Sequence, residues 1–257
     1  MHRIKKVVFI GSGNVATHLA QAAINAGLEI LGIYSRKSET ASVLAKKHHA
    51  KWGNLSEIDI NIADIIIISV PDNAMNDVLM HIPQTNILTV HTSGSMDINI
   101  LTGARVGVFY PLQTFSKSKK LNYRNIPIML EAKQEEDVLL LEQLAQSISD
   151  KVYQINSTQR KKIHIAAIFS SNFTNYLFHI AADLLSKEDI PFGVIQPLIE
   201  ETVEKLKELH PYHAQTGPAV RNDQETISRH LQELIETPEY HEIYKIMSEH
   251  IIKSRKK

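Results

Sequence analysis

The sequence predicts an α/β protein, in which a doubly wound parallel (Rossmann) sheet is followed by an all-helical C-terminal domain. Three observations support this prediction. Short apolar segments alternate with segments of helical periodicity through the first half of the chain, as in sheets whose parallel strands are joined by helices. A glycine-rich motif directly follows the first apolar segment. Beyond residue 156 the strand signals stop, and helical periodicity continues.

The predicted strands are short, and the most apolar of them is Ile65–Val70, which contains four consecutive isoleucines. Such a run is typical of a central parallel strand that helices cover on both faces. In chain order, we expect strands at Lys6–Ile10, Glu29–Tyr34, Ile65–Val70, Ile87–His91, Ala104–Tyr110, Asn125–Glu131 and Lys151–Asn156. We expect the helices between them at Asn14–Ala26, Glu39–Lys47, Ala74–His81 and Glu135–Ser149.

Only helices are expected after the last strand. Their predicted positions are Ser157–Ser186, Phe192–His210, Asp223–Glu236 and Pro238–Ser254. The change of pattern predicts a boundary near Asn156. We therefore expect a dinucleotide-binding domain at residues 1–156 and a helical domain at residues 157–257.

The composition argues against several classes of protein. Lys plus Arg number 28 and Asp plus Glu number 28, whereas nucleic-acid-binding proteins usually carry a basic excess. The absence of cysteine excludes disulfides, thiolate catalysis and cysteine-ligated zinc. The histidine pairs His48–His49 and His210–His213 lack a third ligand at a suitable spacing, so we expect no metal site. No apolar run suits a signal peptide or a membrane span, so we expect a cytoplasmic protein.

The segment "VVFIGSGNVATHLA" matches the dinucleotide-binding pattern G-x-G-x-x-[G/A] between a strand and a helix. Gly11 permits the tight turn, Gly13 lets the backbone approach a diphosphate, and Ala16 lets the helix pack closely on the strand. The diphosphate would then meet free amides at the positive end of the helix. We therefore expect Gly11, Ser12, Gly13, Asn14 and Val15 to bind the cofactor. The alternative is a glycine turn that only packs.

The tip of the second predicted strand carries Ser35, Arg36 and Lys37 where an acidic residue would select NAD. A carboxylate there would repel a 2′-phosphate, whereas a guanidinium binds one with two parallel hydrogen bonds. The three residues therefore predict NADP as the cofactor. Alternatively, Arg36 and Lys37 only begin an exposed helix.

Two further loops follow predicted strands and are expected to line the same cleft, since ligands bind at the carboxyl ends of the strands. The residues concerned are Val70, Pro71 and Asp72 in the first loop, and His91, Thr92, Ser93 and Gly94 in the second. Small and hydroxyl side chains in the second loop suit the close approach of a nicotinamide. Ordinary turn chemistry is the alternative explanation for Pro71 and Gly94.

Three groups of residues are candidates for the substrate site. On the long predicted helix, His164, Ser171, Asn172 and others form a polar stripe, which faces either water or the cleft. In "TGPAVRND", Arg221 is positioned either to bind an acidic substrate group or to pair with Asp223, which caps the next helix. In "YPLQTFS", the expected contributors are Tyr110, Gln113 and Thr114.

The segments "FIGSGNVATHLA", "HTSGS", "YPLQTFS", "HIAAIFSSN" and "TGPAVRND" together resemble a family of Rossmann-like proteins whose C-terminal half is domain of unknown function 2520. The resemblance spans nearly the whole chain. Such proteins are described as NADP oxidoreductases and are similar to pyrroline-5-carboxylate reductase, ketopantoate reductase and the β-hydroxyacid dehydrogenases. The resemblance implies an N-terminal NADP domain, a helical C-terminal domain and a homodimer formed through the C-terminal helices.

The family pattern also implies roles for particular residues. His91, Ser93 and Gly94 match the loop beside the nicotinamide, and the long helix contributes His164 and Asn172. The residues that match the later loop are Thr216, Gly217, Pro218, Arg221 and Asp223. The family commonly has His-Pro-Leu where this chain has Tyr110-Pro111-Leu112, so the proton donor is either His164 or Tyr110.

Together these observations predict an NADP-dependent oxidoreductase that transfers a hydride between nicotinamide and a small C=O or C=N substrate. We expect His164 to act as general acid, because imidazole titrates near neutral pH. Asn172 would orient the reacting group and Arg221 would hold an acidic one. One alternative is a protein that binds NADP(H) without turnover, as a sensor or non-catalytic subunit. Another is a structural homodimer with a vestigial nucleotide site.

Overall fold

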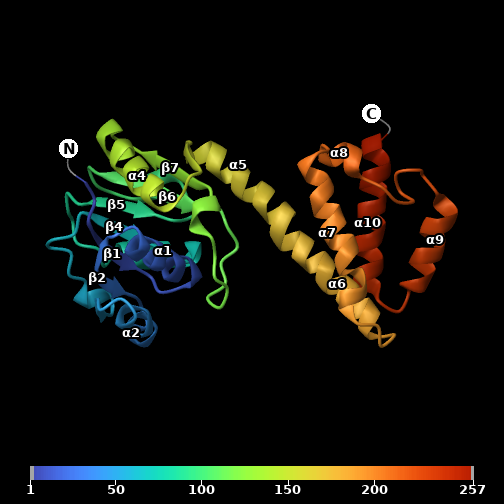
Figure 1. Ribbon diagram of the computed structural model, residues 1–257, viewed down its shortest axis with the longest axis horizontal. Helices are drawn as coiled ribbons and strands as arrows, with labels where there is room; N and C mark the ends of the chain where they lie inside the picture. The colour runs from blue at the N-terminus through green and yellow to red at the C-terminus, as the bar shows by residue number, and fades with distance from the viewer. Residues whose placement is uncertain (1–2, 256–257) are drawn as a thin grey trace. The chain divides into compact units, whose positions relative to one another are not determined.

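The computed structural model describes residues 3–255. The chain is divided into two compact units, and the division falls between Asn172 and Phe173. The first unit contains an eight-stranded sheet in the order β3-β2-β1-β4-β5-β6-β7-β8 (Figure 1). The first six strands follow the 3-2-1-4-5-6 order of a Rossmann fold. The strands are β1 Lys6–Ile10, β2 Glu29–Tyr34, β3 Lys51–Gly53, β4 Ile65–Ile68, β5 Leu88–His91, β6 Val106–Pro111, β7 Ile128–Ala132 and β8 Val152–Gln154.

Helices and short turns bury both faces of this sheet. Successive strand residues point to opposite faces, so that Phe9 enters one core cluster and Ile10 the other. The first face packs against α1 (Asn14–Asn25), α2 (Ser38–Lys46) and α4 (Glu135–Ile148). The second face packs against α3 (Met75–Leu79), the 3₁₀ turns η1 (Leu55–Glu57) and η3 (Ile98–Ile100), and Ile163 of α5. The predicted fold class is thereby confirmed.

The sheet differs from the prediction at two strands. β7 runs antiparallel to β6, because the chain returns through a loop and the 3₁₀ turn η4 (Tyr123–Asn125) without a crossover helix. β3 was not predicted from the sequence. It is a three-residue edge strand whose Trp52 is half exposed, and it lacks the apolar run that marks the buried strands.

The predicted helix Ser157–Ser186 is continuous and has three parts. These are α5 (Ser157–Ala167), the π-helical segment η5 (Ile168–Phe173) and α6 (Thr174–Ser186). Asn156 and Gln159 cap its start reciprocally, with hydrogen bonds of 2.9 and 3.0 Å. The predicted boundary near Asn156 coincides with the start of α5, whereas the compact units divide within η5. The reason is that the first turns of α5 pack on the sheet.

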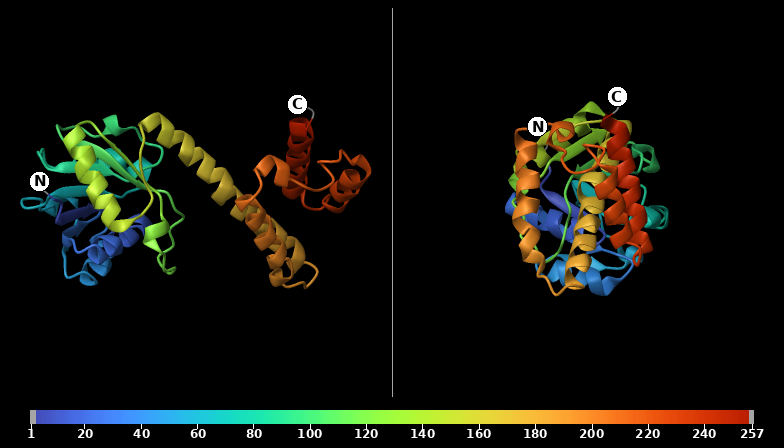
Figure 2. Two further views of the ribbon diagram at one scale, coloured as in Figure 1. Left: turned by 45° about the horizontal axis from the view of Figure 1, so that its top comes forward. Right: turned by 90° about the vertical axis from the view of Figure 1, so that its right-hand side faces the viewer.

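The second unit is helical, as Figure 2 shows from two further directions. Besides α6, it contains η6 (Phe192–Ile195), α7 (Gln196–Glu204), η7 (Lys205–Lys207), α8 (Pro211–Ala214), α9 (Gln224–Glu233) and α10 (Pro238–Arg255). Tyr240 on α10 donates a hydrogen bond of 3.0 Å to Asp183 on α6. Only two apolar side chains of this unit, Ala219 and Ile227, are buried among the residues described.

Candidate functional site

A pocket of about 490 Å³ opens beside the glycine-rich turn, where β1, β2 and β4 end. We call it the glycine-turn pocket. It is lined by Gly11, Ser12, Gly13, Ser35, Arg36, Lys37, Thr40, Leu55, Ser69, Val70, Pro71 and Val78. This is the edge of the sheet at which Rossmann folds bind their ligands.

Two glycines determine the shape of this pocket. Gly11 has a φ of +114°, and a Cβ there would lie 2.1 Å from the backbone oxygen of Ser69, so only glycine fits. A Cβ on Gly13 would instead meet no atom within 4 Å, which leaves open space beside the start of α1. No side chain caps α1, and its first turn carries no acidic residue. The first amides of α1 are therefore suited to an anionic group such as a diphosphate.

Hydroxyl groups connect the glycine turn to the tip of β2. The Thr40 hydroxyl lies 2.7 Å from the Ser12 hydroxyl and 3.2 Å from that of Ser35. The hydroxyls of Ser35 and Thr40 both reach the backbone oxygen of Lys37, at 2.6 and 2.8 Å. These contacts fix the backbone at the strand tip, from which the exposed side chains of Arg36 and Lys37 project beside the pocket.

A second pocket, of about 500 Å³, lies between the end of β6 and helix α5. We call it the helix pocket. It is lined by Tyr110, Leu112, Gln113, Thr114, Ile163, His164, Ala166, Ala167, Ile168, Ser170, Ser171 and Asn172. Its last four residues belong to the π-helical segment η5, and π-helical turns occur frequently at functional sites. The wall is apolar with neutral polar groups, as in many small-molecule sites.

Tyr110 and His164, the two candidate proton donors, meet in the helix pocket. The Tyr110 hydroxyl lies 3.0 Å from His164 Nδ1, and the rings are edge to face with centroids 6.0 Å apart. A Cβ on Gly94 would lie 2.6 Å from His164 Nδ1 and 2.8 Å from Tyr110 Cζ, so glycine leaves the space that this pair occupies. Burial raises the pKa of Tyr110 to about 12, against the opposing charge of Arg160. The hydroxyl is therefore protonated at neutral pH.

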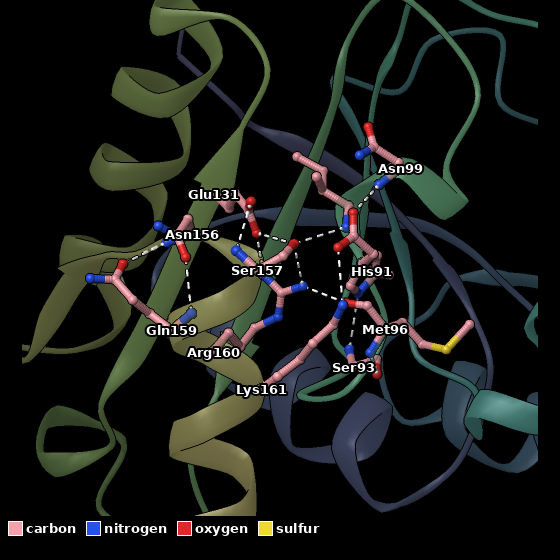
Figure 3. Close-up of polar contacts among 12 residues, drawn as sticks. His91, Ser93, Met96, Asn99, Glu131, Asn156, Ser157, Gln159, Arg160 and Lys161 are labelled. Carbon is pink, nitrogen blue, oxygen red and sulfur yellow. Dashed lines mark hydrogen bonds and ion pairs between the residues drawn. The ribbon is translucent and has the colours of Figure 1, made fainter.

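A buried arginine fixes α5 to the sheet one turn before His164 (Figure 3). Arg160 is 1% exposed, forms an ion pair with Glu131 on β7, and donates a hydrogen bond to the backbone oxygen of Met96. The Ser157 hydroxyl lies 3.0 Å from Arg160 Nη2 and donates to Glu131 at 2.8 Å. The network holds the loop after β5 against α5, and thereby positions Gly94 beside His164.

The two pockets account for part of the predicted site. The predicted cofactor residues that line the glycine-turn pocket are Gly11, Ser12, Gly13, Ser35, Arg36, Lys37, Val70 and Pro71. Those that do not line it are Asn14, Val15, Asp72, His91, Thr92, Ser93 and Gly94. Among the residues predicted for catalysis, His164 and Asn172 line the helix pocket, together with Gln113 and Thr114.

His91, which we expected among the cofactor-binding residues, has its side chain inside the protein. It is fully buried on β5, and its Nδ1 accepts a hydrogen bond of 3.2 Å from the amide of Ser93. Burial, followed by the nearby charge of Arg160, lowers the pKa of His91 to about 4. His91 is therefore neutral at physiological pH, and the geometry gives it a structural role beneath the loop.

The remaining loop residues also bond to one another. The hydroxyl of Thr92 lies 3.0 Å from that of Ser69, which joins the loops that follow β5 and β4. Asp72 accepts a hydrogen bond from the Ser95 hydroxyl. The loop after β5 thus contacts Ser69, which lines the glycine-turn pocket, and its Gly94 lies against His164 and Tyr110, which line the helix pocket.

Arg221 belongs to the second compact unit, where its side chain is exposed. Asp223 accepts a hydrogen bond of 3.1 Å from the amide of Thr226, which confirms the predicted cap of α9. That bond is the first cause of a lowered pKa for the Asp223 carboxyl, and the charge of Arg221 acts in the same direction. The cap thus accounts for Asp223, and Arg221 remains a candidate for binding an acidic group.

Sequence reasoning missed two residues that shape the site. Thr40 lies on the first turn of α2, four residues beyond Arg36, and only the fold brings its hydroxyl to the glycine turn. Arg160 lies in the basic segment "RKK", which is typical of a solvated helix face. Its partner Glu131 is far away in the sequence, so no local pattern signalled the buried pair.

No helix within residues 3–255 is long and apolar enough to span a membrane. Across the same residues, no group of three or more His, Asp or Glu side chains is placed to hold a metal ion.

Comparison with protein families gives two matches. Residues 6–90 match the family described as "NADP oxidoreductase coenzyme F420-dependent", and residues 126–251 match domain of unknown function 2520. Comparison with curated proteins gives no match. The predicted resemblance to Rossmann-like proteins with this C-terminal domain is confirmed.

Solved structures agree with the family matches. A Bacteroides fragilis protein assigned as an NADP oxidoreductase is 41% identical, with a TM-score of 0.92 over 97% of this chain and 98% of its own. Protein TM1727 of Thermotoga maritima (24% identity, TM-score 0.77) covers 95% of this chain and 98% of its own. A 1-pyrroline-5-carboxylate reductase from Streptococcus pyogenes (13% identity, TM-score 0.63) covers 96% of this chain and 98% of its own. The last two show the fold alone.

The first of these relatives is 41% identical and covers nearly the whole chain, and the glycine-turn pocket lies at the edge of the sheet where Rossmann folds bind dinucleotides. The prediction of NADP as the cofactor is confirmed at the level of the family. The chain therefore belongs to the same family of NADP oxidoreductases as the Bacteroides fragilis protein, in which an N-terminal NADP oxidoreductase segment is followed by domain of unknown function 2520.

Proposed function

We propose that this oxidoreductase transfers a hydride between NADP and a small substrate with a C=O or C=N bond, which binds in the helix pocket. The observation that carries the proposal is the pairing of Tyr110 with His164 in that pocket, at 3.0 Å. Such a pair supplies and accepts a proton beside a carbon that gains or loses a hydride. When bound, the nicotinamide supplies the hydride.

The glycine-turn pocket would hold the cofactor. The diphosphate would be bound by the first amides of α1, beside the open space at Gly13. The guanidinium of Arg36 and the ammonium of Lys37 would bind the 2′-phosphate, for which the fixed strand tip provides the position. No acidic side chain lines this pocket among the residues described, so a doubly charged phosphate meets no repulsion there.

His164 would donate the proton in the reducing direction. In the imidazolium form its Nδ1–H donates to the Tyr110 oxygen, which leaves Nε2–H to protonate the substrate oxygen or nitrogen. In the neutral form the Tyr110 hydroxyl donates to Nδ1 instead. Tyr110 thus stabilises both protonation states by rotating its hydroxyl, and its pKa of about 12 prevents it from losing its own proton.

The atoms of the reaction balance without a further reactant. The hydride carries two electrons to the carbon, the proton passes from His164 to the oxygen or nitrogen, and an alcohol or amine and oxidised NADP result. Asn172, which lines the same pocket, would orient the reacting group by a hydrogen bond.

The second unit supports a homodimer formed through the C-terminal helices. Within the part of the chain that the structure describes, this helical unit buries only two apolar side chains, which is less core than a unit of its size needs. Large apolar side chains of this unit are exposed instead: Phe173, Tyr176, Leu177, Leu184, Ile190, Phe192, Val194, Leu198, Val203, Leu206, Leu209, Tyr212, Ile235, Ile246 and Met247. Exposed apolar surface on this scale indicates an interface. A second copy is the partner that we propose.

NADPH oxidation, followed across a panel of keto acids, neutral ketones and cyclic imines, tests the catalytic proposal. We expect turnover with the wild type, and we expect His164→Ala to abolish it while NADPH binding is kept. Tyr110→Phe retains the ring and removes the hydroxyl, and should lower kcat by about tenfold to a hundredfold. Unchanged turnover in His164→Ala would remove His164 from the mechanism. Silence across the panel with micromolar NADPH binding would favour a binding protein.

A further inference from the structure

The loop that follows β6, residues 112–118, lines the helix pocket at one end and contacts helix α1 at the other. Gln113 and Thr114 line the helix pocket. The next two residues, Phe115 and Ser116, contact helix α1 instead. In Figure 1 this green segment descends beside α1. Since α1 begins directly after Gly13, one short loop connects the proposed substrate site with the proposed diphosphate site.

Two polar side chains of α1 hold this loop. Asn14 donates a hydrogen bond of 2.8 Å to the backbone oxygen of Phe115. His18, one turn later, has its Nε2 at 2.9 Å from the backbone oxygen of Ser116. The imidazole also lies against the Phe115 ring, with centroids 5.2 Å apart. The loop itself is largely exposed, so these are its principal anchors on the side of α1.

The partners of His18 fix its tautomer. A backbone oxygen only accepts hydrogen bonds, so Nε2 must carry a proton. The other nitrogen, Nδ1, lies 3.0 Å from the Tyr123 hydroxyl. In the neutral ring Nδ1 accepts from that hydroxyl, and burial raises the pKa of Tyr123, which keeps its proton in place. Both nitrogens of this buried side chain are therefore satisfied.

A buried imidazole is not needed for the packing of α1. The other buried residues of this helix are alanines and one leucine, which are sufficient to pack a helix on the sheet. Burying a polar group is costly unless it is hydrogen-bonded, and His18 satisfies that condition only through the loop and Tyr123. The arrangement indicates that His18 is present to hold the loop.

We propose that His18, together with Asn14, is a positioning residue that couples cofactor binding to the substrate pocket. This inference rests on the proposed function. A diphosphate on the first amides of α1 orders the first turn, which contains Asn14. The ordered turn then fixes Phe115 and Ser116, and through them the positions of Gln113 and Thr114 in the wall of the helix pocket.

Hydrogen exchange of the intact protein tests the coupling without knowledge of the substrate. We expect saturating NADPH to slow amide exchange within residues 112–118 by about five- to tenfold, besides its effect at the glycine turn. His18→Leu should bind NADPH within about threefold of wild type and lose the slowing in the loop. His18→Gln, whose amide can donate to Ser116, should restore it.

The control lies on the same helix. Gln21→Ala removes an exposed hydrogen bond to Asn25, remote from the loop, and should keep the NADPH response. The coupling would be overturned, while the proposed function stands, if NADPH did not change amide exchange within residues 112–118 of the wild type. It would also be overturned if NADPH still slowed that exchange in His18→Leu. Failure of the wild type to bind NADPH would remove both. Should His18→Leu not fold, Tyr123→Phe, which removes the hydrogen-bond partner of His18 Nδ1, is expected to weaken the loop response alone.

Discussion

The two compact units differ in where their apolar side chains lie. In the first, isoleucine, valine and phenylalanine side chains on both faces of the sheet are fully buried. In the second, only Ala219 and Ile227 are buried within the described chain, and leucines such as Leu198 (67% exposed) face outward. The first unit thus buries its own core, whereas the second leaves much of its apolar surface exposed, which is why we propose that a second copy covers it.

The two units also differ in the functions that we propose for them, which are binding and catalysis for the first and assembly for the second. Both pockets, with the cations for a phosphate and the pair formed by Tyr110 and His164, are built within the first unit. The second unit carries the apolar surface that we propose for assembly, and it also carries Arg221. Substitutions in the first unit should therefore act independently of protein concentration, and those on the apolar surface of the second should not.

The largest effect is expected at Arg160. Replacement by leucine leaves the Glu131 carboxylate without its cation in a mostly buried position, and should lower the free energy of unfolding by about 3–5 kcal/mol. Urea unfolding at two protein concentrations would measure the loss and show that it does not depend on concentration.

The adjacent residue provides the control. Lys161 pairs with Asp97 at 3.0 Å, but both side chains are more than 40% exposed. Lys161→Met should therefore cost less than about 1 kcal/mol. Adding Glu131→Gln to Arg160→Leu removes the uncompensated charge and should recover part of the stability. Equal losses for Arg160→Leu and Lys161→Met would show that the buried network does not anchor α5.

The next largest effect is expected on assembly. Leu198→Asp places a charge on the apolar surface of the second unit and should raise the dissociation constant of the homodimer by about a hundredfold, the equivalent of about 3 kcal/mol. Light scattering across a dilution series would measure this change.

Val43 on α2 is the matching control in the first unit, because it is 63% exposed in the single chain. Val43→Asp should leave the mass in solution unchanged. A monomeric wild type at every concentration, or equal dissociation in the two variants, would contradict the proposed interface.

A smaller effect is expected from pH, through His91. Because its folded pKa of about 4 lies below the ordinary 6.5, the neutral form is favoured in the folded state. The corresponding stability is fully present above pH 6.5 and is lost as the pH falls from 6.5 towards 4. About 2 kcal/mol should be gone at pH 5.

The variant His91→Gln does not titrate, so its unfolding free energy should fall less than that of the wild type between pH 7 and pH 5. The contribution belongs to the first unit and should be independent of assembly. Parallel pH profiles for the two proteins would show that His91 does not carry this part of the acid sensitivity.

The architecture was predictable because its signals are local. The isoleucine run at β4 and the glycine turn each identify an element from a few neighbouring residues, and alternation then orders the sheet. β3 was missed because an edge strand of three residues has no apolar run to mark it. The exposed apolar surface of the second unit was hidden by the same helical periodicity that identified its helices.

The site was predictable only in part, because its geometry joins segments that are remote in the sequence. The motifs suggested Tyr110 and His164 as alternatives, and the fold shows that they are partners. His91 stands in a loop motif, but its strand position turns the side chain inward. Arg160 and Glu131 carry no pattern that a linear sequence reveals, since each is an ordinary charged residue until the fold buries them together.

The smallest effect is expected on cofactor affinity, and it tests whether residues of the first unit alone select NADP over NAD. Arg36→Glu should weaken NADPH binding by about tenfold, since one charge-assisted contact to the 2′-phosphate becomes a repulsion in solvent, and should leave NADH binding unchanged. Calorimetry with both cofactors gives the ratio directly. Lys46→Glu makes the same change of charge at the far end of α2, and should alter neither affinity beyond about twofold. If Arg36→Glu lost the same affinity for NADPH and for NADH, the guanidinium would support the loop without recognising the 2′-phosphate. Selection of NADP over NAD would then have to come from Lys37 or Thr40, which line the same pocket.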